Sequence, residues 1–286
     1  MNPETRIRSH ATAAPSGSIR VGERLRQLRV AAGLTQTDLA GDRFSKEYVS
    51  QIERGKTRPT DETVEWLASR LGVDPGFLAN GVSTDERGRV ESALARVEAL
   101  LESDSVSEAA EEMDQVRPLV RATGVPELEA RALLDDAKVK ARQGEVREAL
   151  EVLDQARTLV EAPQFSDIDR AEVLYMLGVC RFKLSSIQTA LALLTEALTL
   201  ADRSGLPCDR LRSDILNFRT RCYQNRRDFE AAREDAERML ELAEALDDRR
   251  SLGKAYFQAS IVAERQGHWV LARSYAERAK AEFEAL

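Results

Sequence analysis

The residues of this chain best suited to chemistry form a short polar series between Ser45 and Arg58. Val49 and Ile52 fall on one side of a helix through this segment. The other side carries polar side chains, with a lysine at its edge: Glu47, Ser50, Gln51, Arg54 and Lys46. These groups donate and accept hydrogen bonds, as recognition of base edges in a DNA groove requires. A helix with that polar face has little reason to exist for packing alone.

Two helices and a tight turn must position these side chains. Thr35 is a suitable N-cap for a first helix, and Asp38, three residues later, can return the capping hydrogen bond. The apolar contact of this helix is the pair Leu39-Ala40. The second helix is expected to begin at Ser45 and to stop at Gly55. A basic loop, residues 56–58, follows it.

The segment from about Arg20 to Leu78 resembles the helix-turn-helix domain of lambda-repressor-like (Xre-type) transcription regulators. The resemblance is carried by an ordered set of residues: Leu34-Thr35-Gln36, Leu39-Ala40, Ser45, Val49-Ser50-Gln51-Ile52-Glu53-Arg54-Gly55, Pro59, Leu67-Ala68 and Leu71-Gly72-Val73. One departure lies between Ala40 and Ser45, where four residues stand in place of the usual five. We therefore expect a tighter turn, with Gly41 or Asp42 taking the strain.

The resemblance implies contacts with double-stranded operator DNA, made by a homodimer on a pseudo-palindrome. Phosphate contacts would fall to residues at helix starts and in the basic loop: Gln36, Ser45, Arg54, Lys56, Thr57 and Arg58. Base reading would fall to Lys46, Glu47, Ser50 and Gln51. The alternative is that these are solvated surface residues, with Glu47 simply paired to Arg54 or Lys46.

Composition predicts two domains that are all-helical. The chain has 286 residues, 32% of them charged and only 5% aromatic, so Ala and Leu must supply most of the packing. Residues 20–60 carry a net charge of +4 and residues 81–286 a net charge of −9, which favours nucleic-acid contact at one end. We expect a cytoplasmic protein without a membrane span. Three scattered cysteines predict no disulfide framework.

A repeat begins near residue 88. Five similar segments are anchored by alanines at intervals of 40–42 residues: Ala109, Ala149, Ala190, Ala232 and Ala272. Such a period predicts stacked helical hairpins that bury their apolar stripes against one another. In four copies a small or turn-prone residue precedes the second helix: Gly144, Ser185, Arg227 and Gly267. The copy with Leu177-Gly178 and Ala190 resembles the tetratricopeptide repeat family, although the period is longer than usual.

These observations divide the chain into four expected parts. Residues 1–18 lack periodicity and are expected to be a disordered arm. The helix-turn-helix domain takes residues 19–79, and residues 80–87 form a linker or hinge. About five hairpins fill residues 88–286, which we expect to serve dimerisation and effector binding.

A concave groove lined by the first helix of each hairpin is the expected effector site. The candidate residues are amides, an arginine and aromatic rings: Tyr175, Phe182, Asn217, Arg221, Gln224, Asn225 and Phe257. Amides suit an extended peptide backbone and Arg221 suits a carboxylate. The architecture resembles peptide-responsive quorum-sensing regulators of Gram-positive bacteria, which implies a signalling peptide or a small-molecule effector. Alternatively, these are ordinary exposed residues or a self-association surface.

Other sequence motifs do not meet the requirements of a nucleotide, metal or catalytic site. The Gly55-Lys56-Thr57 sequence lacks the first glycine and the preceding strand of a phosphate-binding loop. His10 and His268 are too isolated to form a metal site or a catalytic pair. We therefore predict neither an enzyme nor a cofactor. Two rival hypotheses remain: a protein-interaction adaptor, and a regulator controlled by a protein partner such as a toxin or a sigma factor.

Overall fold

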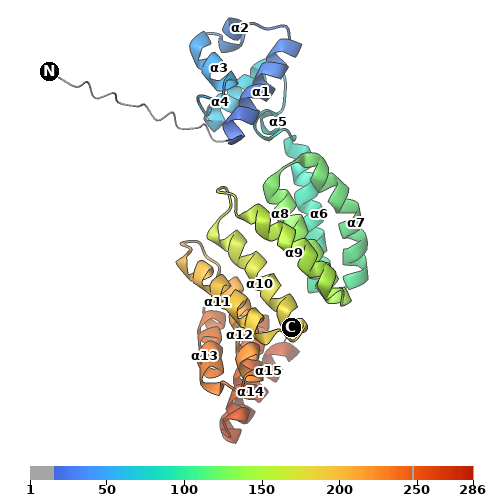
Figure 1. The fold of residues 1–286 in the computed structure, drawn as a ribbon, viewed down its shortest axis with the longest axis vertical. Helices are drawn as coiled ribbons and strands as arrows, with labels where there is room; N and C mark the ends of the chain where they lie inside the picture. Colours follow the sequence, from blue (N-terminus) through green and yellow to red (C-terminus); the bar gives the residue numbers. More distant parts are fainter. Residues whose placement is uncertain (1–15, 247, 286) are drawn as a thin grey trace, which may run out of the picture. The chain divides into compact units, whose positions relative to one another are not determined.

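The computed structural model describes residues 16–246 and 248–285, in which α-helices are the only regular secondary structure (Figure 1). The chain divides into two compact units. The first, here called the small unit, takes the described residues up to Ser92 together with residues 118–125. Residues 93–117 and 126–286 form the second, here called the repeat unit. The prediction of an all-helical protein with a small bundle and helical hairpins is confirmed.

Five helices build the small unit before α6: α1 (Ser16–Ala31), α2 (Gln36–Ala40), α3 (Lys46–Glu53), α4 (Asp61–Leu71) and α5 (Pro75–Asn80). α1 begins inside the segment expected to be a disordered arm, and the rest of that segment, residues 1–15, lies outside the described residues. One apolar core joins the five helices, with members from each: Leu25, Leu39, Ala40, Val49, Ile52, Val64, Leu67, Ala68 and Leu78.

The short turn between α2 and α3 closes as the sequence predicts. Thr35 and Asp38 form a complete capping box at the start of α2. Gly41 ends the helix with a φ of 51°, in the range that favours glycine, so it absorbs the strain of the tight connection. Phe44 then packs edge-on against Trp66 of α4, with ring centroids 5.1 Å apart. This contact fixes where α3 begins.

α1 packs tightly against the end of α3 because residue 22 is glycine. A Cβ atom at this position would lie 2.2 Å from the carbonyl oxygen of Ile52, inside any acceptable contact distance. The guanidinium of Arg24, two residues further along α1, donates to the carbonyl oxygen of Leu78 at 2.7 Å and so ties α1 to α5. The three helices therefore hold one arrangement around the core.

α6 (Thr84–Glu102) begins four residues into the segment expected to be a linker. Ser83 and Glu86 explain this start, because the Glu86 amide donates to the Ser83 hydroxyl and the Ser83 amide donates to the Glu86 carboxylate. This reciprocal pair was missed in the sequence, because Asn80-Gly81 predicts a turn and the whole segment 80–87 was assigned to a linker. Residues 84–87 are thus helical, and α6 and α7 (Val106–Thr123) each contribute to both units.

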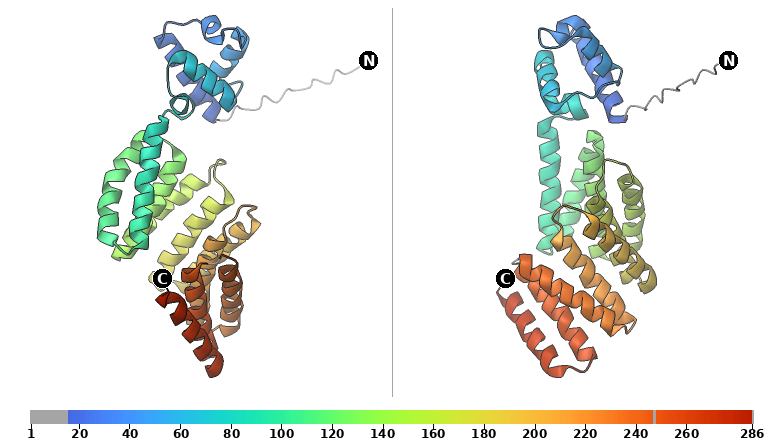
Figure 2. Two further views of the ribbon diagram at one scale, coloured as in Figure 1. Left: turned by 180° about the vertical axis from the view of Figure 1, so that it is seen from behind. Right: turned by 90° about the vertical axis from the view of Figure 1, so that its left-hand side faces the viewer.

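The repeat unit continues with four helical hairpins: α8 (Pro126–Gln143) with α9 (Val146–Val160), α10 (Asp167–Lys183) with α11 (Ile187–Arg203), α12 (Asp209–Asn225) with α13 (Phe229–Leu246), and α14 (Arg249–Arg265) with α15 (Trp269–Glu284). Successive hairpins lie side by side in both views of Figure 2. α8, α10, α12 and α14 contact one another in sequence and form one layer of the stack. The expected solenoid is confirmed.

The repeat alanines and turn residues serve the purposes expected of them. All five anchoring alanines are buried, four of them with no exposed surface. Each predicted turn residue has a positive φ, from 60° at Ser185 and Arg227 to 89° at Gly144. Asp104, with a φ of 62°, marks the same turn in the copy where no such residue was identified. Among the helices of residues 16–246 and 248–285, none combines the length and the apolar composition that a membrane span requires.

Candidate functional sites

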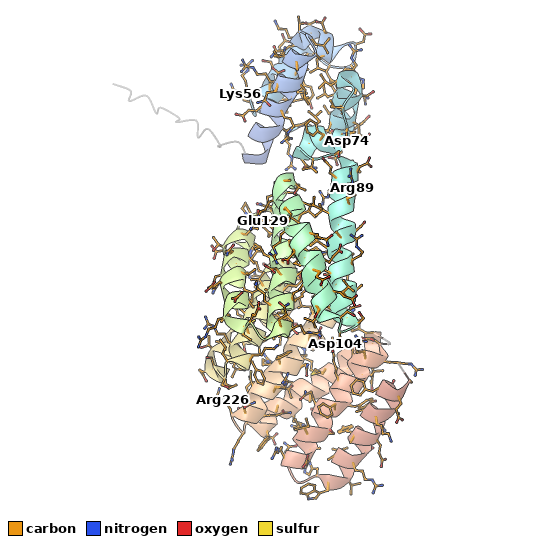
Figure 3. All side chains as sticks on the ribbon, turned by 90° about the vertical axis from the view of Figure 1, so that its right-hand side faces the viewer. Lys56, Asp74, Arg89, Asp104, Glu129 and Arg226 are labelled. Carbon is orange, nitrogen blue, oxygen red and sulfur yellow. The ribbon has the colours of Figure 1, made fainter. Side chains whose placement is uncertain are left out.

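α3 presents most of its predicted polar residues to solvent. Ser45 caps the helix, and its hydroxyl accepts a hydrogen bond from the Tyr48 amide at 3.1 Å. Beyond the cap, the exposed side chains are Lys46, Glu47, Gln51 and Arg54, followed by Lys56 and Arg58 in the next loop. Lys56 lies at the margin of the small unit in the view of Figure 3. A helix end, an exposed polar face and a basic loop therefore form one continuous surface.

Ser50 departs from the predicted arrangement, because its side chain is buried. The Arg54 guanidinium folds back over it: Nε donates to the Ser50 hydroxyl at 3.1 Å and to its carbonyl oxygen at 3.2 Å, and Nη2 also donates to the hydroxyl. The helical spacing places Ser50 between Val49 and Ile52, at the boundary of the packed face. The structure thus brings Ser50 and Arg54 together, and the Ser50 hydroxyl faces Arg54 instead of solvent.

Gln51 has a neighbour that spacing alone does not reveal. The Thr57 hydroxyl donates to the side-chain oxygen Oε1 of Gln51 at 3.1 Å, across the Gly55 turn. Thr57, one of the residues expected to contact phosphate, orients the side chain at the centre of the exposed face. With its oxygen held, the Gln51 amide nitrogen is directed to act as a donor.

Glu53 is the residue of this site that sequence reasoning missed. Its carboxylate is buried and pairs with Arg29 of α1, whose Nε lies 2.6 Å from Oε1 and whose Nη2 lies 3.1 Å from Oε2. Burial alone would raise the pKa of Glu53, but hydrogen bonds from Arg29 and Gln36 outweigh it and lower the pKa below its ordinary value. The side-chain amide of Gln36 donates from Nε2 to the same carboxylate at 2.7 Å. Gln36 therefore links α2 to α3 in this structure.

The repeat unit contains a cavity of about 740 Å³. Of the predicted ligand residues, Tyr175, Asn217 and Arg221 line it. Phe182 does not line the cavity but packs against the lining residue Phe218, with ring centroids 5.8 Å apart. The remaining three do not line it: Gln224 bonds to Gln258, Asn225 donates to the Arg221 carbonyl oxygen, and Phe257 is half exposed elsewhere.

The three cysteines are free and buried. Burial raises the pKa of Cys180 and of Cys222 to about 11, so both remain thiols near neutral pH. No group of three or more His, Cys, Asp or Glu side chains in the described part of the chain is arranged to hold a metal ion.

Comparison with known proteins agrees with this geometry. Residues 20–79 match the model of a family described as a helix-turn-helix domain. The chain is 46% identical over 61 residues to the HTH-type transcriptional regulator DdrOP3 of Deinococcus deserti; the match covers 21% of this chain and 47% of that protein. It is 44% identical over 54 residues to the uncharacterized HTH-type transcriptional regulator y4dJ of Sinorhizobium fredii, covering 18% of this chain and 70% of that protein.

A solved structure matches over both units. The crystal structure of Bacillus thuringiensis PlcR in complex with the peptide PapR7 and DNA covers 93% of this chain and 95% of its own, with a TM-score of 0.64. The sequences are 12% identical, so the likeness concerns the fold.

Proposed function

We propose, from the premise that the chain belongs to the helix-turn-helix-type transcriptional regulators, that it recognises a specific double-stranded DNA sequence through α3. This is a family of regulators rather than of enzymes. The observation that carries the proposal is the exposed face of α3, where Lys46, Glu47 and Gln51 lie beside one another on a helix fixed to α1 and α2. We place this activity in the cytoplasm.

Three side chains would read bases in the major groove. Gln51 projects from the middle of the face with its oxygen held by Thr57, and glutamine suits adenine. Lys46 suits guanine, and Glu47 can accept a hydrogen bond from the cytosine amino group. Each well-placed pair contributes roughly 1–3 kcal/mol of discrimination against the wrong base.

Phosphate contacts would come from the margins of the same surface. Lys56 and Arg58 are exposed, and neither has a carboxylate partner among the residues that the structure describes. The free N–H groups in the first turn of α3 add partial positive charge on the other side of the reading face. Such contacts position the helix without selecting sequence.

The repeat unit would dimerise the protein and receive an effector. One small domain offers few base contacts, so two copies on half-sites about one helical turn apart are needed for tight binding. The cavity lined by Tyr175, Asn217 and Arg221 is the proposed effector site. The fold is shared with PlcR, whose structure holds a peptide and DNA, which favours a peptide. An effector acts by binding one arrangement of the protein more tightly than another.

The test is selection of bound fragments from genomic DNA by the full chain, followed by titration of the selected site at several salt concentrations. We expect one enriched motif and an affinity that falls steeply with salt. The double variant Lys46→Ala with Gln51→Ala should lose at least tenfold in specific affinity, since two base contacts disappear.

A matched control removes one basic residue and one glutamine elsewhere: Arg89→Ala with Gln143→Ala, both exposed outside α3. This variant should bind as the parent does. Absence of any enriched motif, or equal loss in both double variants, would refute recognition through α3 and favour a docking role for the small unit.

A further inference from the structure

The cavity of the repeat unit carries a positive charge that is at odds with its surroundings. Four acidic residues line it: Glu98, Glu102, Glu172 and Asp214. Seven basic residues line it as well: Lys138, Arg142, Lys183, Arg210, Arg221, Arg250 and Lys254. The lining residues therefore sum to plus three, in a segment (residues 81–286) with a net charge of −9. Asp135 and Asp104, which lie outside the lining, pair with two of the basic residues and leave an excess of plus one.

Most of these cations already have partners. Arg210 pairs with Glu102 at 2.9 Å and Lys254 with Asp214 at 3.2 Å. The other pairs are Lys138 with Asp135, Arg142 with Asp104, and Lys183 with the carbonyl oxygen of Ala141. These cations are thus satisfied by the protein itself.

Neither Arg250 nor Arg221 has such a partner among the described residues. Arg250 is exposed, whereas Arg221 is held by two aromatic rings. The guanidinium carbon of Arg221 lies 4.6 Å from the ring centroid of Phe182 and 4.8 Å from that of Phe218. Stacking on aromatic rings occupies the faces of a guanidinium and leaves the N–H groups at its edge available. Within the described residues, no carboxylate pairs with this side chain. Arg221 is therefore a cation fixed in place, with donors directed at no acceptor of the protein.

Polar neighbours of Arg221 add to the site. Asn217 lies one turn earlier on the same face of α12, about 6 Å along the helix. Its side-chain oxygen is buried and has no hydrogen-bond partner among the described residues, a condition that costs stability unless a ligand supplies a donor. Tyr175 packs against Phe218 with ring centroids 6.0 Å apart. Burial raises the pKa of Tyr175, so its hydroxyl keeps its proton and can donate.

We propose that this cavity binds a small organic anion with an apolar body, whose carboxylate or phosphate is held by Arg221. The ligand would carry a hydrogen-bond donor for Asn217 near its charged group. Apolar side chains of the lining receive the remainder: Leu101, Leu134, Ile168, Met176, Val179, Leu211 and Phe218. The inference rests on the proposed function, because it names the chemistry of the effector assigned to the cavity.

Two fluorescent probes that differ by one charge test the proposal on the full chain. 8-Anilinonaphthalene-1-sulfonate has an apolar body and a negative group, and N-phenyl-1-naphthylamine is the same body without that group. We expect the sulfonate to bind at least tenfold more tightly, which corresponds to about 1.4 kcal/mol. Arg221→Gln should reduce this preference to less than twofold, and Arg221→Lys should keep part of it because the charge remains.

Arg226→Gln is the matched control, because Arg226 is exposed just beyond α12 and does not line the cavity (Figure 3). It should keep the full preference. Circular dichroism of each variant verifies that the helices are intact. A wild-type chain that binds both probes equally, or an intact Arg221→Gln variant that keeps the tenfold preference, would overturn the anion site.

Displacement of the sulfonate probe then separates the two sources of anion. Hippurate offers a carboxylate, an N–H and a phenyl ring; phenyl phosphate offers a phosphate; hippuramide is the neutral control. Displacement by either anion but not by hippuramide supports the site and identifies its preferred group. Equal displacement by hippuramide would contradict it.

Failure of this inference is distinguishable from failure of the proposed function. A chain that selects a DNA motif yet shows no charge preference in the cavity remains a regulator, with an effector of other chemistry. A chain that prefers the anion yet selects no DNA motif keeps the anion site and loses the proposed function.

Discussion

Glu53 determines the orientation of α3 more directly than any residue on the exposed face of that helix. Its carboxylate accepts hydrogen bonds from Arg29 of α1 and Gln36 of α2, so one buried group joins three helices. The Arg29 side chain is only 13% exposed and that of Glu53 only 4%. Removing one partner of such a pair leaves a buried charge without compensation, and this accounts for most of the lost stability.

We therefore predict that Glu53→Gln lowers the unfolding free energy of the small unit by about 3 kcal/mol at neutral pH. Urea unfolding followed through Trp66 fluorescence measures this, in a background where the exposed Trp269 is replaced by Phe. Glu65→Gln on the exposed side of α4 is the control and should change stability by less than about 0.5 kcal/mol.

The same variant gives a pH signature. In the folded state the pKa of Glu53 lies below its ordinary value of 4.5. The stabilisation that the ionised Glu53 carboxylate gives to the fold is therefore complete above pH 4.5. It is lost as the pH falls through the pKa of the folded state. The gap between wild type and Glu53→Gln should accordingly narrow as the pH falls from about 6 to about 3. A gap that stays constant or widens on acidification would contradict the ion pair.

At the scale of elements, the turns inside the hairpins differ in backbone strain from one repeat to the next. Gly144 and Gly267 adopt positive φ values freely, whereas Ser185, Arg227 and Asp104 adopt them with a side chain attached. An L-residue in this region costs about 1–2 kcal/mol, and glycine there avoids most of the cost while losing about 0.5–1 kcal/mol through the freedom of its unfolded chain.

Ser185→Gly should accordingly stabilise the repeat unit by about 0.5 kcal/mol. The neighbouring Ser186 provides the control, because its φ is −83° and its side chain makes no capping bond. Ser186→Gly should destabilise by about 0.5–1 kcal/mol, since it gains only unfolded-state freedom. Urea unfolding followed by circular dichroism compares the two; equal effects would show that the backbone at Ser185 carries no strain.

These elements also show how far the sequence predicts the structure. Capping residues, turn residues and repeat alanines act within a few positions of one another, so Thr35, Gly41 and the five alanines could be assigned from spacing. Ser50 was assigned to the wrong environment because it lies on the boundary between the two faces of α3, where one side chain, Arg54, decides what is covered. Glu53 and Arg29 are 24 residues apart, and no local pattern pairs them.

The ligand residues of the repeat unit follow the same rule. Tyr175, Asn217 and Arg221 were found because the first helix of each hairpin lines the cavity at regular spacing. Gln224 and Asn225, about one turn further along α12, were predicted as ligand residues as well, but they do not line the cavity. Helical periodicity predicts which face of a helix a residue lies on, but not where along the helix the cavity ends. The excess of positive charge in the lining could not be recognised from the sequence either, because its basic residues come from four helices: α8, α10, α12 and α14.

For the whole molecule, the charge distribution and the proposed symmetry act together. A net charge of +4 on residues 20–60 attracts DNA, while −9 on residues 81–286 discourages nonspecific contact along it. With one reading helix per chain, the proposed dimer would supply specificity by placing two chains on one site. The second contact then becomes intramolecular, which raises affinity by about 10²–10⁴ without any new interaction.

The spacing of half-sites should therefore control affinity. In the selected DNA motif, inserting five base pairs between the half-sites turns one of them to the opposite face of the duplex, and affinity should fall at least about a hundredfold, towards that of a single half-site. Inserting ten base pairs returns both half-sites to one face and should recover part of the loss. Gel shifts with purified full chain measure all three sites. Equal affinity for all three sites would mean that each chain binds alone and that dimerisation has no part in recognition.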